Sequence, residues 1–172
     1  MKILKRSLQI ALMVIVLFLI VAFFVLNHVK KAAIPDYNKD VPLKGLSSEV
    51  IVLRDALGNP HVYAKNENDL YHAVGFIMAQ DRLWQMDLLR RVTQGRLSEI
   101  LGKDLVNADW LMRMLRIQEK SEKILASSSP EIIAILKAFS EGMNDYIRSY
   151  PLPTEFKVLG YKPDPWEPVH SI

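Results

Sequence analysis

Two polar side chains, Gln80 and Asp81, stand where a helix that faces a protein core would carry apolar residues. Helical steps from Leu70 place one apolar face at Ala73, Val74, Ile77, Trp84 and Leu88. Gln80 and Asp81 share that face, and burying a carboxylate or an amide is costly unless it is hydrogen-bonded. We therefore predict a specific polar network inside a packed core. A catalytic Asp81 is the alternative, but no partner for it stands nearby in the sequence.

Other residues that could do chemistry show no catalytic pattern. The sequence has no glycine-rich phosphate loop, no His-Glu-x-x-His, no Gly-x-Ser-x-Gly and no cysteine. His61 has no second ligand at metal-binding spacing, so we expect it to pack across a hairpin. Asp87 precedes Arg90 and Arg91 by three and four residues, which predicts solvent-exposed ion pairs on a helix.

A β-hairpin is the first element expected to position these residues. Glu49–Arg54 is rich in β-branched residues, and His61–Ala64 forms a second short run. Asp55–Pro60 between them contains Gly-Asn-Pro, which is typical of a turn.

Helices are predicted after the hairpin. Asn66 or Asn68 would cap a long helix over about Asn68–Thr93, and Gly95 would end it in a left-handed conformation. A short helix is expected over Leu97–Leu101, ending at Gly102. A second is expected over Asp109–Arg116, with Asp109 as its N-cap and its arginines in solvent. A third is expected to begin at Ser129-Pro130-Glu131 and to stop at Pro151.

The last of these helices carries an apolar stripe that we expect to be core, consisting of Ile132, Leu136, Phe139, Met143 and Ile147. Residues 151–168 are rich in proline and aromatic side chains and are expected to be irregular, wrapping over a neighbouring surface. The pattern as a whole predicts an α+β segment in which a hairpin precedes helices.

The N-terminus carries a membrane signal. Residues 10–26 are an unbroken apolar run with basic residues on both sides, close to the length needed to cross a bilayer. No small-residue cleavage site follows it, so an uncleaved signal anchor is favoured over a cleaved signal peptide. The flanking charges predict a single pass in a bacterial cytoplasmic membrane, with residues 34–172 on the periplasmic or extracellular side. The predicted organisation is an anchor over 1–33, a linker over 34–48 and a domain over 49–172.

The charge balance excludes one class of partner. The whole chain has a net charge of +3, but residues 34–172 hold 17 basic and 19 acidic side chains, a balance of −2. The basic character belongs to the anchor and does not indicate nucleic-acid binding. The absence of cysteine also excludes a disulfide scaffold and a thiol-linked lipid anchor.

Several blocks of the sequence resemble, in order, the penicillin acylase (penicillin amidase) family. They span about residues 45–170 and comprise the hairpin Val50–Ala64, the block Gly75–Asp87 with Ala79-Gln80-Asp81-Arg82-Leu83, Arg90-Arg91, Gly95–Gly102, Glu141–Asn144 and Pro163–Pro168. The resemblance implies the N-terminal part of an αββα N-terminal-nucleophile hydrolase fold, here preceded by a transmembrane or signal-anchor helix.

The resemblance also implies an activity. Family members are precursors that cut themselves into an α chain and a β chain, and the serine freed at the start of the β chain is the nucleophile. Its α-amine, which titrates near pH 8, can act as the base. The parent protein would hydrolyse linear amides, releasing an acyl group from an amine such as a β-lactam or an acyl-homoserine lactone.

None of the family's catalytic, substrate-binding or metal residues matches a position in residues 1–172, so no such site residue is assigned. Calcium is expected in the full-length family member, with no cofactor residue in this chain. The expected partners are the rest of the α chain, the β chain, a small-molecule amide substrate and the membrane through residues 10–26. The alternative interpretation is a non-catalytic, membrane-anchored interaction or remnant fragment, because such a segment would expose sheet edges and apolar helix faces.

Overall fold

The protein is described by a computed structural model that covers the backbone of residues 2–32 and 35–172 and the side chains of residues 9–27 and 35–172. The chain divides into two compact units, Met1–Asn38 and Lys39–Ile172, which are described separately.

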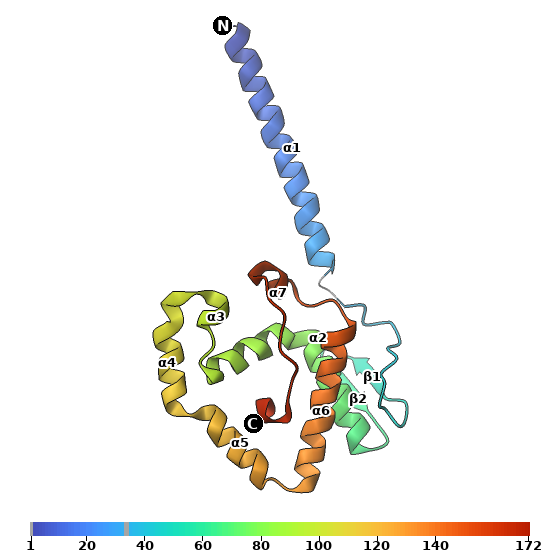
Figure 1. The fold of residues 1–172 in the computed structure, drawn as a ribbon. Helices are drawn as coiled ribbons and strands as arrows, with labels where there is room; N and C mark the ends of the chain where they lie inside the picture. Colours follow the sequence, from blue (N-terminus) through green and yellow to red (C-terminus); the bar gives the residue numbers. More distant parts are fainter. Residues whose placement is uncertain (1, 33–34) are drawn as a thin grey trace. The chain divides into compact units, whose positions relative to one another are not determined.

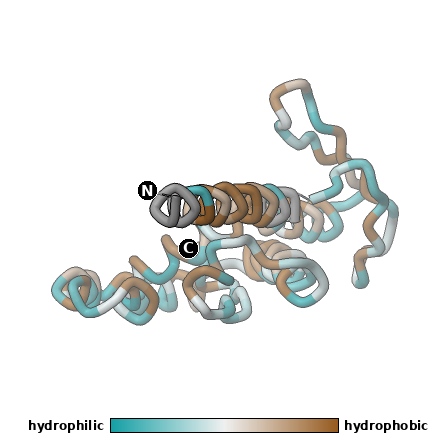
Figure 2. The backbone as a smooth tube through the Cα atoms, turned by 90° about the horizontal axis from the view of Figure 1, so that it is seen from above, coloured by the Kyte–Doolittle hydropathy of each residue, from teal (hydrophilic) through white to brown (hydrophobic). Residues whose placement is uncertain are grey.

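The first unit contains helix α1, Lys2–Ala32. Its Gln9–Asn27 segment is long and apolar enough to cross a membrane and is not buried in the structure. Figure 2 shows most of this segment in the hydrophobic colour. A signal sequence near the N-terminus has the same properties, so this observation fits both an anchor and a signal peptide.

The second unit begins with the predicted hairpin. Strands β1 (Ile51–Arg54) and β2 (Pro60–Tyr63) pair antiparallel, with Ile51 opposite Tyr63 and Leu53 opposite His61. Asp55 shapes the turn, since its Oδ1 accepts hydrogen bonds from the backbone N–H groups of Leu57 and Asn59. The hairpin is confirmed, and most of its side chains are exposed.

Helix α2 (Glu67–Gln94) is the long helix that the sequence predicts. The Asn66 side chain accepts a hydrogen bond from the Asp69 N–H at its start, and Gly95 ends it with φ 63° and ψ 48°. Both termini therefore follow the capping chemistry expected of these residues.

Helix α6 (Pro130–Ser149) packs against α2 (Figure 1) and also begins as predicted, with the Ser129 side chain as its N-cap. The two backbones touch at a pair of glycines. A Cβ atom at Gly142 would lie 1.8 Å from the backbone oxygen of His72, and one at Gly75 would lie 2.0 Å from that of Phe139. This close approach brings together the main core, which comprises Phe76, Ala79, Leu83, Met143, Tyr146, Phe156 and Trp166.

The predicted core stripe of α6 is only partly buried. Met143 is fully buried and Phe139 packs against the core, but Ile132 is 47% exposed. The close contact between α2 and α6 is at Gly142, in the second half of α6. The first turn of α6, which contains Ile132, therefore lies away from this contact.

Short elements complete the second unit (Figure 1): α3 (Ser98–Leu101), a 3₁₀ turn η1 (Lys103–Leu105), α4 (Val106–Leu115), α5 (Ile117–Ser127), α7 (Thr154–Leu159) and a 3₁₀ turn η2 (Pro168–Ser171). Helix α5 was not predicted. The expectation that residues 151–168 are wholly irregular is wrong, because α7 forms there. Phe156 anchors α7 between the rings of Trp84 and Tyr161, with centroid separations of 5.5 and 5.1 Å.

Asp109 does not cap the helix that it was expected to begin. Helix α4 starts three residues earlier, at Val106, and Asp109 is buried inside it. Its carboxylate instead accepts hydrogen bonds from the N–H groups of Leu97 and Ser98, each at 2.8 Å, and from the Ser98 hydroxyl at 2.5 Å. Asp109 therefore caps the preceding helix, α3, and ties it to α4.

The arginines of α4 were expected to form a solvated face, and one of them has a structural partner. Arg113 is exposed, but its Nε donates a hydrogen bond to the backbone oxygen of Gly95 at 3.0 Å. Arg116 is exposed and pairs with Glu119.

Replacement of Asp109 by asparagine is expected to change the acid sensitivity of the fold. Burial alone raises the pKa of Asp109, but hydrogen bonds from Ser98 and Leu97 outweigh it and hold the pKa below its ordinary value of 3.8. A lowered folded-state pKa contributes stability above the unfolded-state pKa, and this stability is lost as the pH falls through the folded-state pKa. Asp109→Asn should cost about 1 kcal/mol at pH 7.

Urea unfolding midpoints between pH 7 and pH 2.5 measure this effect. The difference between the wild type and Asp109→Asn should shrink as the pH falls below about 4, because the unfolded chain then binds a proton at Asp109 more readily than the folded protein does. Asp104→Asn, at an exposed position in η1, is the matched control. A difference that stays constant down to pH 2.5 would contradict the role assigned to the ionised Asp109.

Candidate functional site

Gln80 and Asp81, the residues that the sequence singles out, bind the hairpin to α2. Arg54 of β1 donates two hydrogen bonds to the Asp81 carboxylate, at 2.9 and 3.0 Å, and one to Gln80 Oε1 at 3.3 Å. The Arg54 and Asp81 side chains are 18% and 20% exposed. The polar network exists, but its predicted place inside the packed core is wrong: it lies at the edge of α2, where Arg54 can reach it.

A double-mutant cycle measures what this contact contributes. Arg54→Ala, Asp81→Ala and the double variant are expected to give a coupling free energy of about 1 kcal/mol, near the upper end for partly exposed pairs because the contact is bidentate. Urea unfolding of the full chain provides the values, and the exposed Arg116–Glu119 pair is the comparison, with an expected coupling of about 0.3 kcal/mol. Equal coupling in both pairs would mean that the Arg54 contact does not hold the hairpin.

A cluster of buried charges lies further along α2, around Asp87. The Asp87 side chain is completely buried and accepts hydrogen bonds from Arg90 Nη2, from Arg91 Nε at 3.1 Å and from the Tyr161 hydroxyl at 2.8 Å. The prediction of exposed ion pairs at these positions is wrong. The segment around Tyr161 covers this face of the helix, and the spacing of charges along α2 gives no sign of that cover. These four residues are called the Asp87 cluster.

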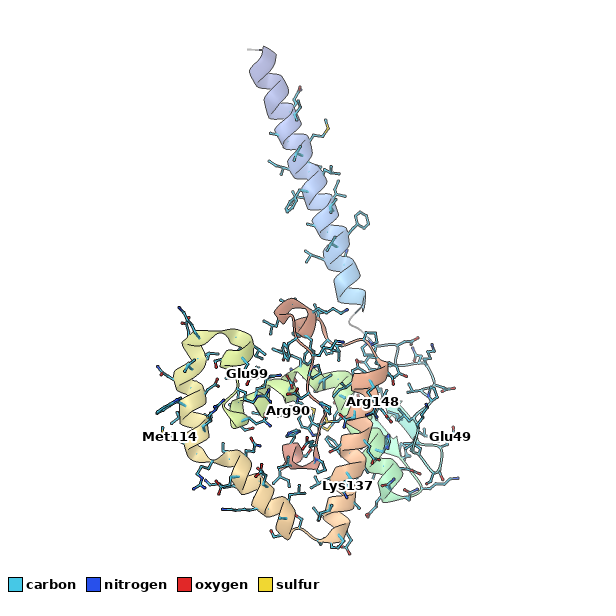
Figure 3. The ribbon with its side chains drawn as sticks, in the orientation of Figure 1. Glu49, Arg90, Glu99, Met114, Lys137 and Arg148 are labelled. Atoms are coloured by element: carbon cyan, nitrogen blue, oxygen red, sulfur yellow. The ribbon has the colours of Figure 1, made fainter. Side chains whose placement is uncertain are left out.

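The two arginines of the Asp87 cluster continue the network into the C-terminal segment. Arg90 donates hydrogen bonds to the backbone oxygens of Asp164 and Pro165, both at 3.1 Å. Its guanidinium carbon lies 4.8 Å from the centre of the Trp166 ring, a cation–π contact. Figure 3 shows Arg90 in the middle of the second unit, among the elements that it connects.

Arg91 makes the equivalent connection toward α3. Its Nη1 donates to Glu99 at 3.0 Å, and its guanidinium carbon lies 4.7 Å from the Tyr161 ring centre. The Asp164 carboxylate accepts a hydrogen bond from Arg96 Nη1 at 3.1 Å. The cluster therefore holds α2, α3 and the segment around residue 164 in one arrangement.

The Asp87 cluster has a structural role and not a catalytic one. Burial, followed by the hydrogen bond to Asp87, raises the pKa of Tyr161 well above its ordinary value, so this hydroxyl stays protonated. Both Asp87 oxygens already accept hydrogen bonds from charged or hydroxyl donors, which leaves the carboxylate poorly suited to act as a base or a metal ligand.

An apolar groove of about 400 Å³ lies beside the Asp87 cluster. It is bordered by α2, α5, α6 and the last residues of the chain, with Met86, Leu89, Ile117, Phe139, Trp166 and Ile172 among its lining residues. Leu89 is 64% exposed within it. His170 lies in the lining, and burial followed by the charge of Arg90 lowers its pKa, which favours the neutral imidazole.

A second buried histidine pairs α2 with α6. His72 Nε2 lies 2.9 Å from Asp145 Oδ2, and its buried Nδ1 has no hydrogen-bond partner in the structure. A Cβ atom at Gly45 would lie 3.3 Å from the His72 ring, so the backbone of the 39–48 segment covers it. Neither residue could be predicted as part of a pair from the sequence, because they lie 73 positions apart.

No metal site is found in the part of the chain that the structure describes, where three or more histidine or acidic side chains nowhere gather as ligands. The most buried carboxylates, Asp69, Asp87 and Asp109, are each surrounded by hydrogen-bond donors, and a hard cation needs the opposite arrangement.

Comparison with known proteins identifies the family of the chain. The family model for penicillin amidase matches residues 49–172. The chain belongs to the penicillin amidase family. The family resemblance of the hairpin and of the Ala79–Leu83 block is thus confirmed.

Individual relatives carry acylase names. The chain is 42% identical to the penicillin acylase 2 proenzyme of Pseudomonas sp. (strain SE83) over 83% of this chain and 18% of the relative. It is 36% identical to the acyl-homoserine lactone acylase QuiP of Pseudomonas fluorescens (strain Pf0-1) over 76% of this chain and 16% of the relative. The chain thus spans less than a fifth of the length of these relatives.

A solved structure supports the architecture. The thermostable penicillin G acylase from Alcaligenes faecalis matches with a TM-score of 0.64 and 31% identity, over 72% of this chain and 68% of that one. The mixed architecture of helices and a two-stranded sheet in this penicillin amidase family chain is therefore shared with a family member of known structure.

Proposed function

We propose that this chain is the N-terminal part of the α chain of a penicillin acylase-like amidohydrolase, and that it acts as a scaffold. The observation that carries the proposal is the apolar groove beside the Asp87 cluster, in a chain that spans 18% of its penicillin acylase 2 relative. The Asp87 cluster fixes the walls of the groove, and the groove presents apolar side chains that a longer precursor could cover.

The reaction proposed for the whole protein is hydrolysis of a linear amide, which releases an acyl group from an amine. The relatives' names, penicillin acylase and acyl-homoserine lactone acylase, support this substrate class. The nucleophile would be a serine at the start of a β chain, with its own α-amine as base. A calcium ion, if the complete protein binds one, would be held by residues outside this chain.

The proposed location is a bacterial cytoplasmic membrane. Residues 1–33 would form a single-pass signal anchor, 34–48 a linker and 49–172 the family domain on the periplasmic or extracellular side. The support is the apolar Gln9–Asn27 helix and the excess of positive charge before it.

Association in trans tests the scaffold role. The full 172-residue chain would be tagged and co-expressed with the penicillin acylase 2 proenzyme of Pseudomonas sp. lacking the matching segment. We expect the tag to capture the remainder and the complex to hydrolyse penicillin G or an acyl-homoserine lactone. The 172-residue chain alone should be inactive, since the proposed nucleophile lies outside it.

Two exposed leucines give a matched pair of variants for this experiment. Leu89 is in the groove, whereas Leu57 is in the hairpin turn and is 88% exposed. Leu89→Arg should reduce capture at least tenfold and Leu57→Arg should leave it unchanged, because only the first places a charge in the apolar groove. Hydrolysis by the chain alone would overturn the scaffold role. A stable chain that captures nothing would favour the alternative of a non-catalytic interaction or remnant fragment.

A further inference from the structure

Turn η2 is closed by the side chain of His170. The backbone N–H of Glu167 donates a hydrogen bond to His170 Nδ1 at 2.9 Å, and the Glu167 side chain accepts one from the backbone N–H of His170. On α2, the Nη1 group of Arg90 lies 3.4 Å from the same His170 Nδ1. This one nitrogen therefore joins the two ends of the turn and connects the turn to the Asp87 cluster.

Both groups that face His170 Nδ1 can only donate hydrogen bonds. A backbone N–H and a guanidinium offer no acceptor, so Nδ1 must present its lone pair and the ring proton must be on Nε2. A second proton on the ring would have to bind Nδ1, and the new N–H group would then point at two other N–H donors. The neutral imidazole is therefore the form that closes the turn.

The charges around His170 come from α2 and its C-terminal end and from the segment that contains His170. Arg90 and Arg96 disfavour a positive imidazole, whereas Asp164 and Glu167 favour one. Burial, followed by the charge of Arg90, lowers the pKa of His170 below its ordinary value of 6.5. Among the described residues that line the groove with His170, α5 and α6 contribute only uncharged side chains: Ile117, Gln118, Ser121 and Phe139.

Opening of the turn would change one wall of the apolar groove. Val169, His170 and Ser171 line the groove, and η2 packs against α5 and α6 beside the C-terminus marked in Figure 1. The Trp166 ring meets the His170 ring edge-on at 5.5 Å between centres, and Trp166 Nε1 donates a hydrogen bond to the Ser171 hydroxyl at 2.9 Å. The environment of Trp166 therefore reports whether the turn is closed.

We propose that His170 is a pH-sensitive latch, which holds η2 closed while its imidazole is neutral and releases the turn when the imidazole is protonated. A group whose pKa is lower in the closed form stabilises that form above its ordinary pKa, and this stabilisation is lost as the pH falls through the closed-form pKa. The turn should therefore be closed at about pH 7.5 and open at about pH 5. The latch is a property of this chain and does not depend on the proposed acylase function.

Fluorine NMR of the full chain in detergent tests the latch between about pH 8 and pH 5. Fluorotryptophan would replace Trp84, Trp110 and Trp166, and isotope labelling of the histidine nitrogens would report the tautomer and the protonation of His170. His170→Asn keeps an acceptor oxygen close to the position of Nδ1 but cannot be protonated in this range, whereas His170→Ala has no acceptor. His61→Asn, at an exposed histidine of β2, is the matched control.

The expected result is a shift of the Trp166 signal that follows the protonation of His170, with a midpoint below 6.5, while the Trp84 and Trp110 signals stay in place. His170→Asn should abolish the shift and keep the high-pH signal of Trp166. His170→Ala should show the low-pH signal of Trp166 throughout, and His61→Asn should titrate like the wild type.

Three results would overturn the latch. A Trp166 shift that persists in His170→Asn would assign the pH response to another group. Protonation of His170 without a change at Trp166 would show that the turn stays closed. A ring proton on Nδ1 at high pH would contradict the acceptor role on which the latch depends.

Discussion

Asp87→Ala is expected to destabilise the second unit by about 3–5 kcal/mol, because it leaves two buried guanidinium groups and a partly buried hydroxyl without their shared acceptor. The free energy of unfolding of domains of this size is about 5–15 kcal/mol, so the variant should lose a large share of it and unfold at a much lower urea concentration. Urea unfolding of the full chain in detergent, followed by circular dichroism, measures the effect. Tyr161→Phe removes one neutral donor and should cost only about 1 kcal/mol.

Glu141→Ala is the matched control for Asp87→Ala. It removes a carboxylate at an exposed position of α6, and its effect should stay within about 0.5 kcal/mol. An Asp87→Ala protein within 1 kcal/mol of the wild type would show that Asp87 is not the buried centre of the structure. The segment around residue 164 would then have to be held on α2 in another way.

Gly142→Ala is also expected to destabilise the second unit strongly. Helix propensity alone predicts a gain of about 1 kcal/mol for alanine over glycine. The new Cβ atom would instead lie 1.8 Å from the backbone oxygen of His72, so α2 and α6 must separate. Overpacking against backbone costs about 3 kcal/mol, and the sign of the effect is therefore reversed.

Ala134→Gly on the exposed side of α6 measures propensity without the contact. It should destabilise the protein by about 1 kcal/mol in the same urea experiment. A Gly142→Ala variant that is more stable than the wild type would mean that α2 and α6 do not touch at this glycine.

Local signals in the sequence were sufficient to predict the elements whose ends are marked by capping or turn residues. Caps at Asn66, Gly95 and Ser129 define α2 and α6 to within a few residues, and a Gly-Asn-Pro turn defines the hairpin. These features depend on hydrogen bonds between near neighbours in sequence, which residue type alone can indicate.

The Asp87 cluster could not be predicted in the same way. Asp87 and Tyr161 are 74 positions apart, and spacing along one helix gives the same pattern for an exposed and a buried ion pair. Asp109 was misassigned for a related reason, since its carboxylate binds N–H groups that precede it by 11 and 12 residues. The groove likewise depends on four separate segments of the chain.

The central claim is that residues 49–172 form a working part of an acylase precursor. The most direct test replaces the matching segment of the Pseudomonas sp. penicillin acylase 2 proenzyme with residues 49–172 and measures cleavage of the precursor into two chains together with amide hydrolysis. The account predicts that the chimera is cleaved and active, and that it loses both properties when it carries Asp87→Ala. A folded chimera that stays uncut and inactive would contradict the claim.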